Sequence, residues 1–361
     1  PQFAKSDMFA RACRAAMTQI RNGGTSLEAQ VSSLFHGCQI QDDPSTNSGT
    51  GSNLTLQGTV ECDASIMTDQ GRFGAVGAVS GIKNPIYVAK KLLDVAQEGL
   101  LPLGRVSPIF MVGPGAGEWA KEHGLETISN SRLLTDSSLN TYLNHMRRYH
   151  QANDSARRQK RFKLSSDAED DESDSLGHDT VGAICVDAIG NVASGVSSGG
   201  ISLKFPGRIG EAAIFGSGCW AQKMSGNADS MACSCTGTGE QLMLTSLSQQ
   251  FSFAMQENVN IHEAMKKTLQ SKFLDDPVLD TFPEKNAGLL AVKFTSRVKS
   301  SRCDIVELCY GHTTQSMGIG YMSANHGKPQ FKMSRKSPDG NEQDIVCSSL
   351  MFKLNKEALR N

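Results

Sequence analysis

Two hydroxyl side chains stand where a β-hairpin would bring them together. Residues 180–187 and 192–198 are runs of β-branched and small residues, and the short segment between them has the composition of a turn. If that turn centres on Ile189, Thr180 faces Ser198. Directly opposed side chains lie about 4.5–5.5 Å apart on one face of a sheet, and a slip of one residue would separate them. The spacing therefore predicts a hydroxyl pair at the open end of a hairpin.

A threonine hydroxyl is a weak nucleophile until a base removes its proton. An N-terminal threonine carries its own base, an α-amine with an ordinary pKa of about 7.7–8.0. That amine exists here only if the chain is cut before Thr180, and a polar, charged segment directly upstream makes such a cut plausible. The alternative is an ordinary buried hairpin whose hydroxyls satisfy backbone groups, and spacing alone favours this alternative.

Two glycine-rich segments further along the chain carry groups that suit acyl transfer. Arg208 lies in the turn 206–211 (PGRIGE), where a planar guanidinium would bind a carboxylate through two hydrogen bonds. Residues 235–240 (CTGTGE) lead into an amphipathic helix whose apolar side carries Leu242 and Phe251, with Met243 and Leu247 between them. Free backbone N–H groups in such a turn form an anion site or an oxyanion hole. A surface arginine and a plain capped helix are the alternative interpretations.

The segment 145–178 differs in kind from the rest of the chain. Its first part, 145–163, holds seven basic residues, and residues 167–174 hold six acidic ones. Such a segment buries too little apolar surface to order itself, so it is predicted to be a flexible, exposed linker. Its basic centre predicts a nuclear localisation signal or, equally, a solvated helix end. The basic residues concerned are Arg157, Arg158, Lys160 and Arg161.

Composition sets the outer limits. The 361 residues carry 36 basic and 37 acidic side chains, a balance that argues against a wholly basic nucleic-acid wrapper. The sequence contains no run of 18 apolar residues, which is the length that a membrane-spanning helix needs. Ten cysteines are scattered without a C-x-x-C pair, which predicts reduced, mostly buried thiols and no metal site. His178, His262 and His312 are too dispersed to indicate a catalytic triad.

Periodicity and turn residues predict alternating helices and strands around these groups. Helical spacing before the glycines at 23 and 24 indicates a first helix, and Pro85 suits the first position of another. Gly113 opens a further helical stretch. The ranges expected are helices at 7–22, 25–38 and 85–98, and strands at 54–60, 61–67, 74–79 and the two arms of the hairpin.

Several strings in the chain resemble the type-2 asparaginase family of N-terminal nucleophile hydrolases. The resemblance covers 46–79 and 179–240 most clearly and recurs over most of the chain. It implies an α+β fold, the four-layer αββα sandwich, made as one precursor and cut into an α subunit 1–179 and a β subunit 180–361. The strings are GSNL at 51–54, ECDASIM at 61–67, GAVGAVSGIKNP at 74–85, GCWA at 218–221, HTTQSM at 312–317 and YMSA at 321–324. The last two of them point to the branch of the family that cuts proteins after aspartate.

This resemblance implies a role for each catalytic residue. The Asp179–Thr180 bond is cut autocatalytically, Thr180 becomes the nucleophile, and its α-amine becomes the base. Ser198 occupies the place of a second hydroxyl that tunes the first. The Thr236 hydroxyl and the Gly237 N–H form the oxyanion hole.

The resemblance also implies how substrate is held. Arg208 binds a substrate carboxylate, and Asn47 lies in a loop that lines the site. Asparaginases place the α-carboxylate of an amino acid on this arginine, whereas an aspartate endopeptidase places the aspartate side chain there. Glu211 stands where asparaginases have an aspartate that pairs with the free amine of the substrate. It keeps the acid and lengthens it, which favours either retained amino-acid hydrolysis or a repositioned side chain.

The family further implies no cofactor and no metal for the chemistry, although some relatives hold a sodium ion on a loop that here falls near 39–46. The family's first strand carries a His-x-Gly-Ala-Gly motif, and this chain begins after it, so a sheet is expected to lose a member and its neighbours to gain unpaired edges.

The resemblance further implies protein substrates, which are a trithorax-type methyltransferase and the TFIIA precursor. The expected location is the nucleus, with some protein in the cytoplasm. The expected assembly is a dimer of α/β pairs, with no direct nucleic-acid or membrane partner.

Other interpretations stay open at this point. The chain is alternatively an asparaginase or isoaspartyl peptidase acting on small amides, or an inactive, uncleaved nuclear scaffold. Residues 195–199 fit the G-x-S-x-G pattern of serine hydrolases, but no helix is expected after them. Residues 113–117 (GPGAG) only superficially resemble a dinucleotide-binding loop.

Overall fold

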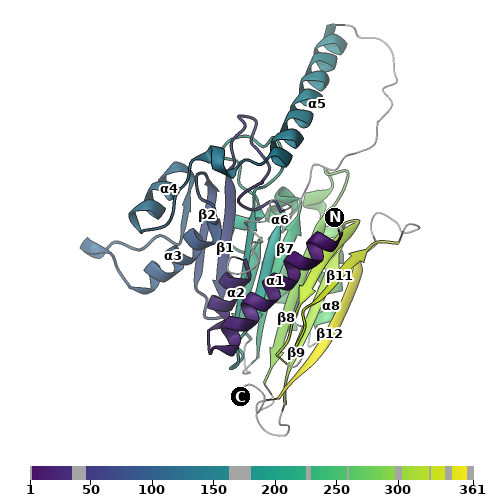
Figure 1. Ribbon diagram of the computed structural model, residues 1–361. Helices are drawn as coiled ribbons and strands as arrows, with labels where there is room; N and C mark the ends of the chain where they lie inside the picture. Colours follow the sequence, from purple (N-terminus) through teal and green to yellow (C-terminus); the bar gives the residue numbers. More distant parts are fainter. Residues whose placement is uncertain are drawn as a thin grey trace.

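The computed structural model describes residues 2–34, 46–161, 180–224, 229–257, 260–296, 303–324, 327–337 and 344–355. Its centre is a pair of β-sheets packed face to face, with helices on the outer face of each (Figure 1). This is the αββα sandwich that the family resemblance implies.

The first sheet has the strand order β3-β2-β1-β5-β4. All its pairs are antiparallel except β2 with β3. Strands β1, β2 and β5 are buried at every position, because helices cover one face and the second sheet covers the other. Their sequences are therefore continuous runs of small and apolar residues rather than alternating ones. The strands are β1 Cys62–Thr68, β2 Phe73–Val79, β3 Phe110–Val112, β4 Val181–Val186 and β5 Val192–Ser198.

The second sheet has the order β12-β9-β8-β7-β6 and is antiparallel throughout. Hydrogen bonds join the two sheets, including one from the Ser194 hydroxyl to the Cys233 carbonyl at 2.7 Å. Strands β10 and β11 form a separate two-stranded sheet. The strands are β6 Cys219–Lys223, β7 Ser230–Gly237, β8 Ala287–Thr295, β9 Cys303–His312, β10 Ser316–Tyr321, β11 Gln330–Arg335 and β12 Val346–Asn355.

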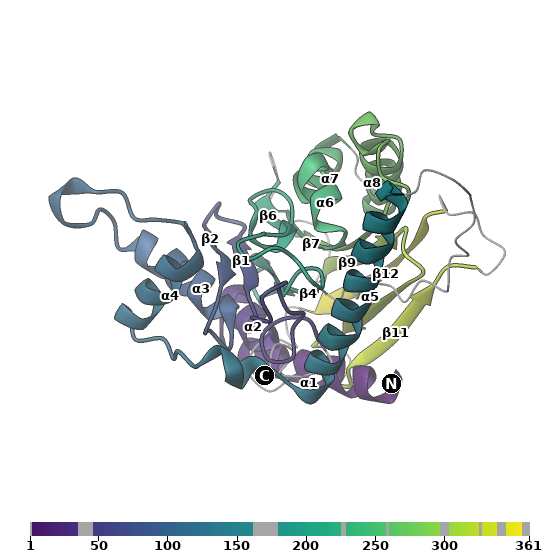
Figure 2. The ribbon, with the colours of Figure 1, turned by 90° about the horizontal axis from the view of Figure 1, so that it is seen from above.

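Helices form the two outer layers. Helices α2 and α3 cover the first sheet, while α7 and α8 cover the second, and Figure 2 shows α6, α7 and α8 on the side opposite α1 and α2. No described helix is both long and apolar enough to cross a membrane. The α-helices are α1 Gln2–Arg21, α2 Ser26–Leu34, α3 Pro85–Gln97, α4 Gly113–Glu122, α5 Asp136–Arg161, α6 Gly239–Thr245, α7 Leu247–Glu257 and α8 Ile261–Leu269.

Five short turns of helix complete the description. They are 3₁₀ or π segments at η1 Pro102–Gly104, η2 Asn130–Leu133, η3 Glu211–Ala213, η4 Gln270–Leu274 and η5 Pro277–Leu279.

The predicted flexible linker at 145–178 is wrong for residues 145–161, which continue helix α5. Thr135 and Ser138 cap its first turn reciprocally through their hydroxyls, and the Tyr142 hydroxyl donates to the Leu56 carbonyl. No glycine or proline interrupts the segment, so the helix propagates from this base. It projects beyond the sheets (Figure 1), and its backbone includes the predicted localisation residues. Residues 162–178 lie outside the described part.

Two smaller expectations need correction. Residues 54–60 form no strand and carry only isolated bridges, one between Leu54 and Val60 and one between Thr55 and Lys204. The second helix is described as far as Leu34, and the remaining expected positions 35–38 lie outside the described residues. The amphipathic helix after Gly239 is two helices, because Ser246 adopts a positive φ of 48° and ends the first of them.

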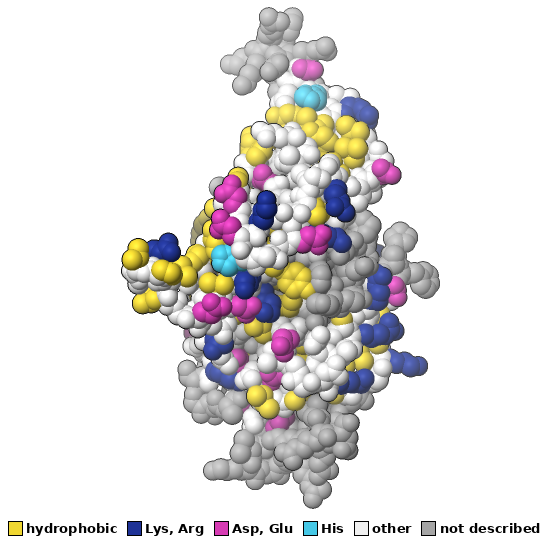
Figure 3. Space-filling model, turned by 60° about the vertical axis from the view of Figure 1, so that its left-hand side comes forward, with side chains coloured by type: hydrophobic (Ala, Val, Ile, Leu, Met, Phe, Trp, Pro, Cys, Tyr) yellow, Lys and Arg dark blue, Asp and Glu magenta, His cyan; other side chains and the backbone are white. Residues whose placement is uncertain are grey.

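One segment between α3 and β3 presents apolar side chains to solvent. Figure 3 shows hydrophobic atoms gathered on this protruding segment. The large side chains concerned are at least about half exposed: Leu100, Leu103, Val106 and Ile109, with Val112 at its end.

Candidate active site

The hairpin register places Thr180 beside Ser198, as predicted. Val181 pairs with Ser197 and Val186 with Val192, so the turn centres on Ile189. The Thr180 hydroxyl lies 3.1 Å from the Ser198 hydroxyl. Thr180 immediately precedes β4, which is an edge strand of its sheet among the described residues. The nucleophile candidate therefore stands at a strand end, where the chain enters the sandwich.

Glu211 is the second partner of Thr180. Its carboxylate oxygen Oε1 lies 3.0 Å from Thr180 Oγ1, and the hydroxyl donates its one proton to Glu211 or to Ser198 at any moment. Glu211 begins the short helix η3 and is only 3% exposed. Burial raises the pKa of Glu211 to about 7, against the opposing effects of its hydrogen bonds and of the nearby Arg208. A carboxyl with this pKa is well placed to exchange a proton near neutral pH.

Ser198 is held in place by the loop that follows it. The Gly200 N–H donates to the Ser198 hydroxyl at 3.0 Å, so this oxygen is an acceptor that lies between the backbone and Thr180. Asn47 fixes the same loop: its carbonyl accepts from Gly199 N–H at 2.7 Å and its side-chain amide donates to the Gly200 carbonyl at 2.7 Å. Asn47 is therefore placed as a support of the Ser198 loop. The described contacts do not join it to Thr180.

Arg208 lies beside Glu211 in a setting built from glycines. A Cβ at Gly200 or Gly239 would lie 2.7 or 2.8 Å from its guanidinium nitrogens, so a side chain at either position would displace the guanidinium. The guanidinium makes two hydrogen bonds to Glu240, at 2.8 and 2.7 Å. Burial lowers the pKa of Arg208, but Glu240 and the other nearby carboxylates outweigh burial and raise it overall. Arg208 therefore stays positively charged, and it already binds the Glu240 carboxylate.

Asp63 positions the turn that carries Arg208 and Glu211. It is fully buried, and its two oxygens accept from the N–H groups of Ala78 and Gly210, each at 2.8 Å. Lys204 is buried nearby and donates to the Glu61 carbonyl at 2.7 Å. Burial raises the pKa of Asp63, while the Lys204 charge and these hydrogen bonds oppose that rise.

Thr236 and Gly237 end strand β7 directly before α6. Gly237 has a φ of 143°, and a Cβ there would lie 2.2 Å from the Asn286 carbonyl, so glycine is required. The sheets approach closely at this end, because a Cβ on Gly182 would lie 2.1 Å from the Ser234 hydroxyl. Alternate residues share a strand face, so the close approach of Gly182 and Ser234 also brings Thr180 and Thr236 toward one another.

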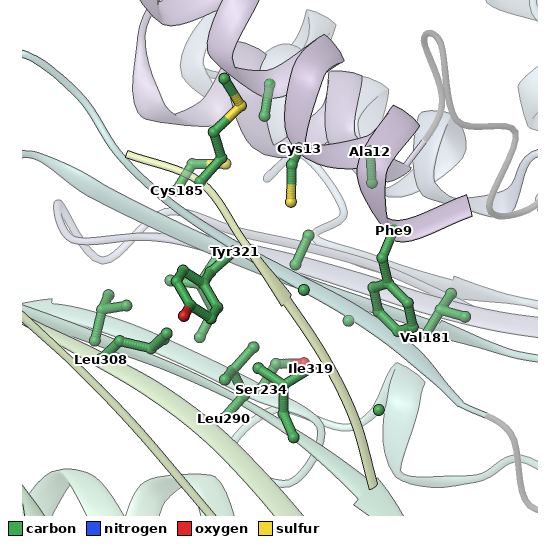
Figure 4. Close-up of a pocket in the computed structure, with 18 of the residues that line it drawn as sticks. Phe9, Ala12, Cys13, Val181, Cys185, Ser234, Leu290, Leu308, Ile319 and Tyr321 are labelled. Carbon is green, nitrogen blue, oxygen red and sulfur yellow. The ribbon is translucent and has the colours of Figure 1, made fainter. Parts of the chain in front are cut away.

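Thr180, Thr236 and Gly237 line one cavity of about 560 Å³. The cavity continues between α1, β4 and β10, where Figure 4 shows Phe9, Val181 and Ile319 turned toward it. Its lining is largely apolar away from the three site residues. Arg208 and Glu211 do not line this cavity, so Thr180 joins two separate regions, one charged and one apolar.

Some predicted site residues cannot be placed. Asp179 and most of the predicted ion loop at 39–46 lie outside the described residues, as do the side chains of the basic cluster at 157–161. Conversely, sequence reasoning missed the role of Glu240 as partner of Arg208 and of Asp63 as organiser of the turn. Asp63 lies in the string at 61–67, and Glu240 ends the glycine-rich segment 235–240, where an acid beside a turn was the available signal.

The fold and the site together define a hydrolase of the N-terminal nucleophile class. The sequence profile of the family described as Asparaginase matches residues 2–303, and the chain belongs to this family. It is 32% identical to an isoaspartyl peptidase/L-asparaginase of Bos taurus over 79% of this chain and 82% of that protein. It is 30% identical to a probable isoaspartyl peptidase/L-asparaginase of Arabidopsis thaliana, covering 72% of this chain and 77% of that protein. A plant-type L-asparaginase of Pyrobaculum calidifontis is also 30% identical, with 78% of each chain covered.

Proposed function

We propose that this chain is the precursor of a threonine aspartase: it cuts itself between Asp179 and Thr180 and then cleaves other proteins after aspartate. The observation that carries the proposal is the contact between the Thr180 hydroxyl and the buried Glu211 carboxyl. Its geometry supports both steps, for the separate reasons that follow.

Self-cleavage needs a base that the uncut chain already possesses. Before the cut, Thr180 has an amide nitrogen and no α-amine, so the self-activation used by the mature class is absent. Glu211 lies within hydrogen-bond distance and accepts the hydroxyl proton as Thr180 Oγ1 attacks the carbonyl carbon of Asp179. The C–N bond breaks, the proton passes to the leaving nitrogen, and the chain is joined by an ester. Water hydrolyses that ester and leaves a free Thr180 amine.

In the mature enzyme the Thr180 amine takes over as base. The aspartate side chain of a protein substrate binds Arg208, which must then share its guanidinium between Glu240 and the substrate. The main-chain carbonyl of that aspartate meets Thr180 Oγ1, and the Thr236 hydroxyl with the Gly237 N–H stabilises the oxyanion. Ser198 holds the nucleophile's orientation between attacks.

Glu211 meets the two kinds of substrate differently. An amino-acid amide presents an ammonium group, which pairs with an ionised carboxylate and would lower the pKa of Glu211 on binding. Without substrate, burial raises the pKa of Glu211 to about 7, and Thr180 engages its carboxyl. The corresponding nitrogen of a protein substrate is an uncharged amide and forms no such ion pair.

A second candidate is hydrolysis of small β-aspartyl amides, as in an isoaspartyl peptidase or asparaginase. The names of the relatives favour it directly. In that case Arg208 binds the α-carboxylate of the amino acid and Glu211 its ammonium group, while Thr180 attacks the side-chain carbonyl. The two candidates use the same nucleophile and differ in which substrate group each charged residue meets.

The test starts with the purified chain and its Thr180→Ala variant, with the exposed Thr141→Ala variant as control. After long incubation, intact mass should show two fragments meeting at Asp179 and Thr180 in the parent and the control, and none in Thr180→Ala. Turnover by Thr180→Ala would refute the nucleophile assignment. Processed enzyme is then given a quenched peptide containing Gln-x-Asp-Gly and, separately, a β-aspartyl dipeptide and L-asparagine. Cleavage of the peptide alone supports the aspartase, and cleavage of the small amides alone supports the second candidate.

Partners and location remain part of the same proposal. The trithorax-type methyltransferase and the TFIIA precursor are the proposed substrates, the nucleus is the proposed main location, and two processed α/β pairs are proposed to associate. The basic residues at the end of α5, on a helix that projects from the body, support access to an import receptor.

A further inference from the structure

Three side chains capable of binding a metal converge away from the active site. They are His262 on α8, Cys309 on β9 and Cys347 on β12. The two sulfur atoms are 3.9 Å apart, and Cys347 Sγ lies 3.5 Å from His262 Nδ1. All three candidate ligand atoms lie within 4.8 Å of one another. None of these residues lines the cavity at Thr180.

The strand pairing explains why both cysteines face the same helix. Cys347 pairs with Gly311 and Ser349 pairs with Cys309, so the cysteines are diagonal neighbours on adjacent antiparallel strands. Residues two apart share a face of the sheet, which places both sulfurs on the side covered by α8 (Figure 1).

A glycine lets α8 come close enough to complete the cluster. A Cβ on Gly311 would lie 2.8 Å from atoms of Met265 and Leu269, which therefore press directly on the β9 backbone. The start of α8 is fixed by Asn260, whose side-chain oxygen accepts from the His262 and Glu263 N–H groups. His262 is consequently held one turn before Met265, beside Cys347.

The Cys309–Cys347 and Cys347–His262 separations match the edges of a tetrahedral zinc site. Zn–S bonds of about 2.3 Å and Zn–N bonds of about 2.0–2.1 Å at tetrahedral angles place two sulfurs about 3.8 Å apart and a sulfur and a nitrogen about 3.6 Å apart. We propose that His262, Cys309 and Cys347 bind a zinc ion that ties the C-terminal strand β12 to β9 and α8.

The chemistry of the three ligands suits this ion. Zinc binding releases the two thiol protons to solvent, and the two thiolates with a neutral imidazole balance the charge of Zn²⁺. His262 and Cys347 are half-buried, so water can supply the fourth ligand. A disulfide fits less well, because bonded sulfurs lie about 2.05 Å apart and the residues directly opposite each cysteine are a glycine and a serine.

The experiment measures zinc in the full-length chain purified without chelator, then stripped and reloaded with ZnCl₂ in the presence of a competing weak chelator. We expect one zinc per chain, and a sulfur-to-metal charge-transfer band when Co²⁺ replaces it. His262→Gln and Cys347→Ser should each lose stoichiometric zinc and the cobalt band, and should lower the melting temperature only when zinc is present. The matched control is Cys13→Ser, a half-buried thiol on α1 outside the cluster, which should keep both signals.

Three results would overturn the proposal. One is the absence of stoichiometric zinc in the parent chain under these conditions. Another is zinc binding that persists unchanged in the double variant Cys309→Ser/Cys347→Ser, since the ion would then lie elsewhere. The third is a mass two hydrogens short under reducing-agent-free purification, with Cys309 and Cys347 in one cross-linked peptide.

Discussion

Replacing Glu211 by glutamine is expected to slow self-cleavage and to stabilise the fold at the same time. Glutamine keeps the size of the side chain and an oxygen that accepts from Thr180, and it removes the ionisable group. A residue needed only for packing would change both properties in the same direction. Replacing a buried base should change the cleavage rate and the stability in opposite directions, because its charge destabilises the fold but is required for the reaction.

The stability gain follows from the pKa of Glu211. An unfolded glutamate ionises at its ordinary value of 4.5, whereas burial raises the folded value to about 7. Between these two values the folded state binds more protons than the unfolded state, so stability falls as pH rises from about 4.5 to 7 and stays low above. The difference between the folded and unfolded pKa values corresponds to a loss of about 3 kcal/mol in the free energy of unfolding above pH 7. The Glu211→Gln variant should lack this loss and should be more stable than the parent at pH 8 by up to about 3 kcal/mol.

The expected rate loss follows from its role as base. General bases contribute about 10²–10⁴-fold, so self-cleavage of Glu211→Gln should slow by at least about 100-fold. In the parent chain the rate should rise with pH as Glu211 ionises and level off above about pH 7. The pH profile of residual cleavage in the variant should not contain that step.

Two assays separate these effects. Self-cleavage is followed by intact mass over pH 5–8 in the parent and in Glu211→Gln. Stability is measured by denaturant unfolding at pH 5 and pH 8 in chains that also carry Thr180→Ala, which keeps them uncut. Since the Thr180 hydroxyl helps to lower the pKa of Glu211, its removal should widen the stability difference. Unchanged self-cleavage in Glu211→Gln, or equal pH dependence of stability in both chains, would refute the reasoning.

Three further outcomes are expected. Arg208→Ala should reduce cleavage after aspartate by about 10–100-fold relative to other residues, because a two-point charge-assisted contact is lost; an unchanged preference in a peptide library would remove Arg208 from the carboxylate site. Ser198→Ala should slow turnover while the adjacent Ser197→Ala, whose hydroxyl bonds the Asp63 carbonyl, should not; equal rates in a single-turnover assay of both would contradict this. Replacing the basic residues at 157–161 by glutamine should lower nuclear accumulation in imaging; an unaltered distribution would leave them as a solvated helix end.

The hairpin and its register were predictable because a sheet has a strict period of two. Once the turn is centred on Ile189, the pairing of the two strands follows, and it sets Thr180 against Ser198. The helix starting at Pro85 was equally accessible, since proline at the first position is a local signal. These features depend on neighbours in the chain, which is what a sequence pattern records.

Features that depend on distant contacts were not predictable from the residues. The extent of α5 is set at its base by contacts of Tyr142 and His145 with Leu56 and Ser202, far away in sequence. Composition alone suggested disorder there, because it reflects the number of charged residues and not the tertiary contacts that hold the base of the helix. The Glu240 partner of Arg208 and the His262 cluster likewise arise from packing between layers.

The charge balance of the site gives Glu211 a role beyond that of a base. The cations beside the buried carboxyls of Asp63 and Glu211 and the half-buried carboxyl of Glu240 include Arg208 and Lys204. A substrate carboxylate arriving at Arg208 adds a further negative charge, and a protonated Glu211 removes one. In the proposed mechanism, substrate binding therefore favours protonation of the same carboxyl that must be ionised for self-cleavage. The conflict disappears after the cut, because the new Thr180 amine supplies the base and leaves Glu211 free to bind its proton. The proposed order of events, first self-cleavage and then substrate hydrolysis, is thus favoured by the electrostatics of a single buried side chain.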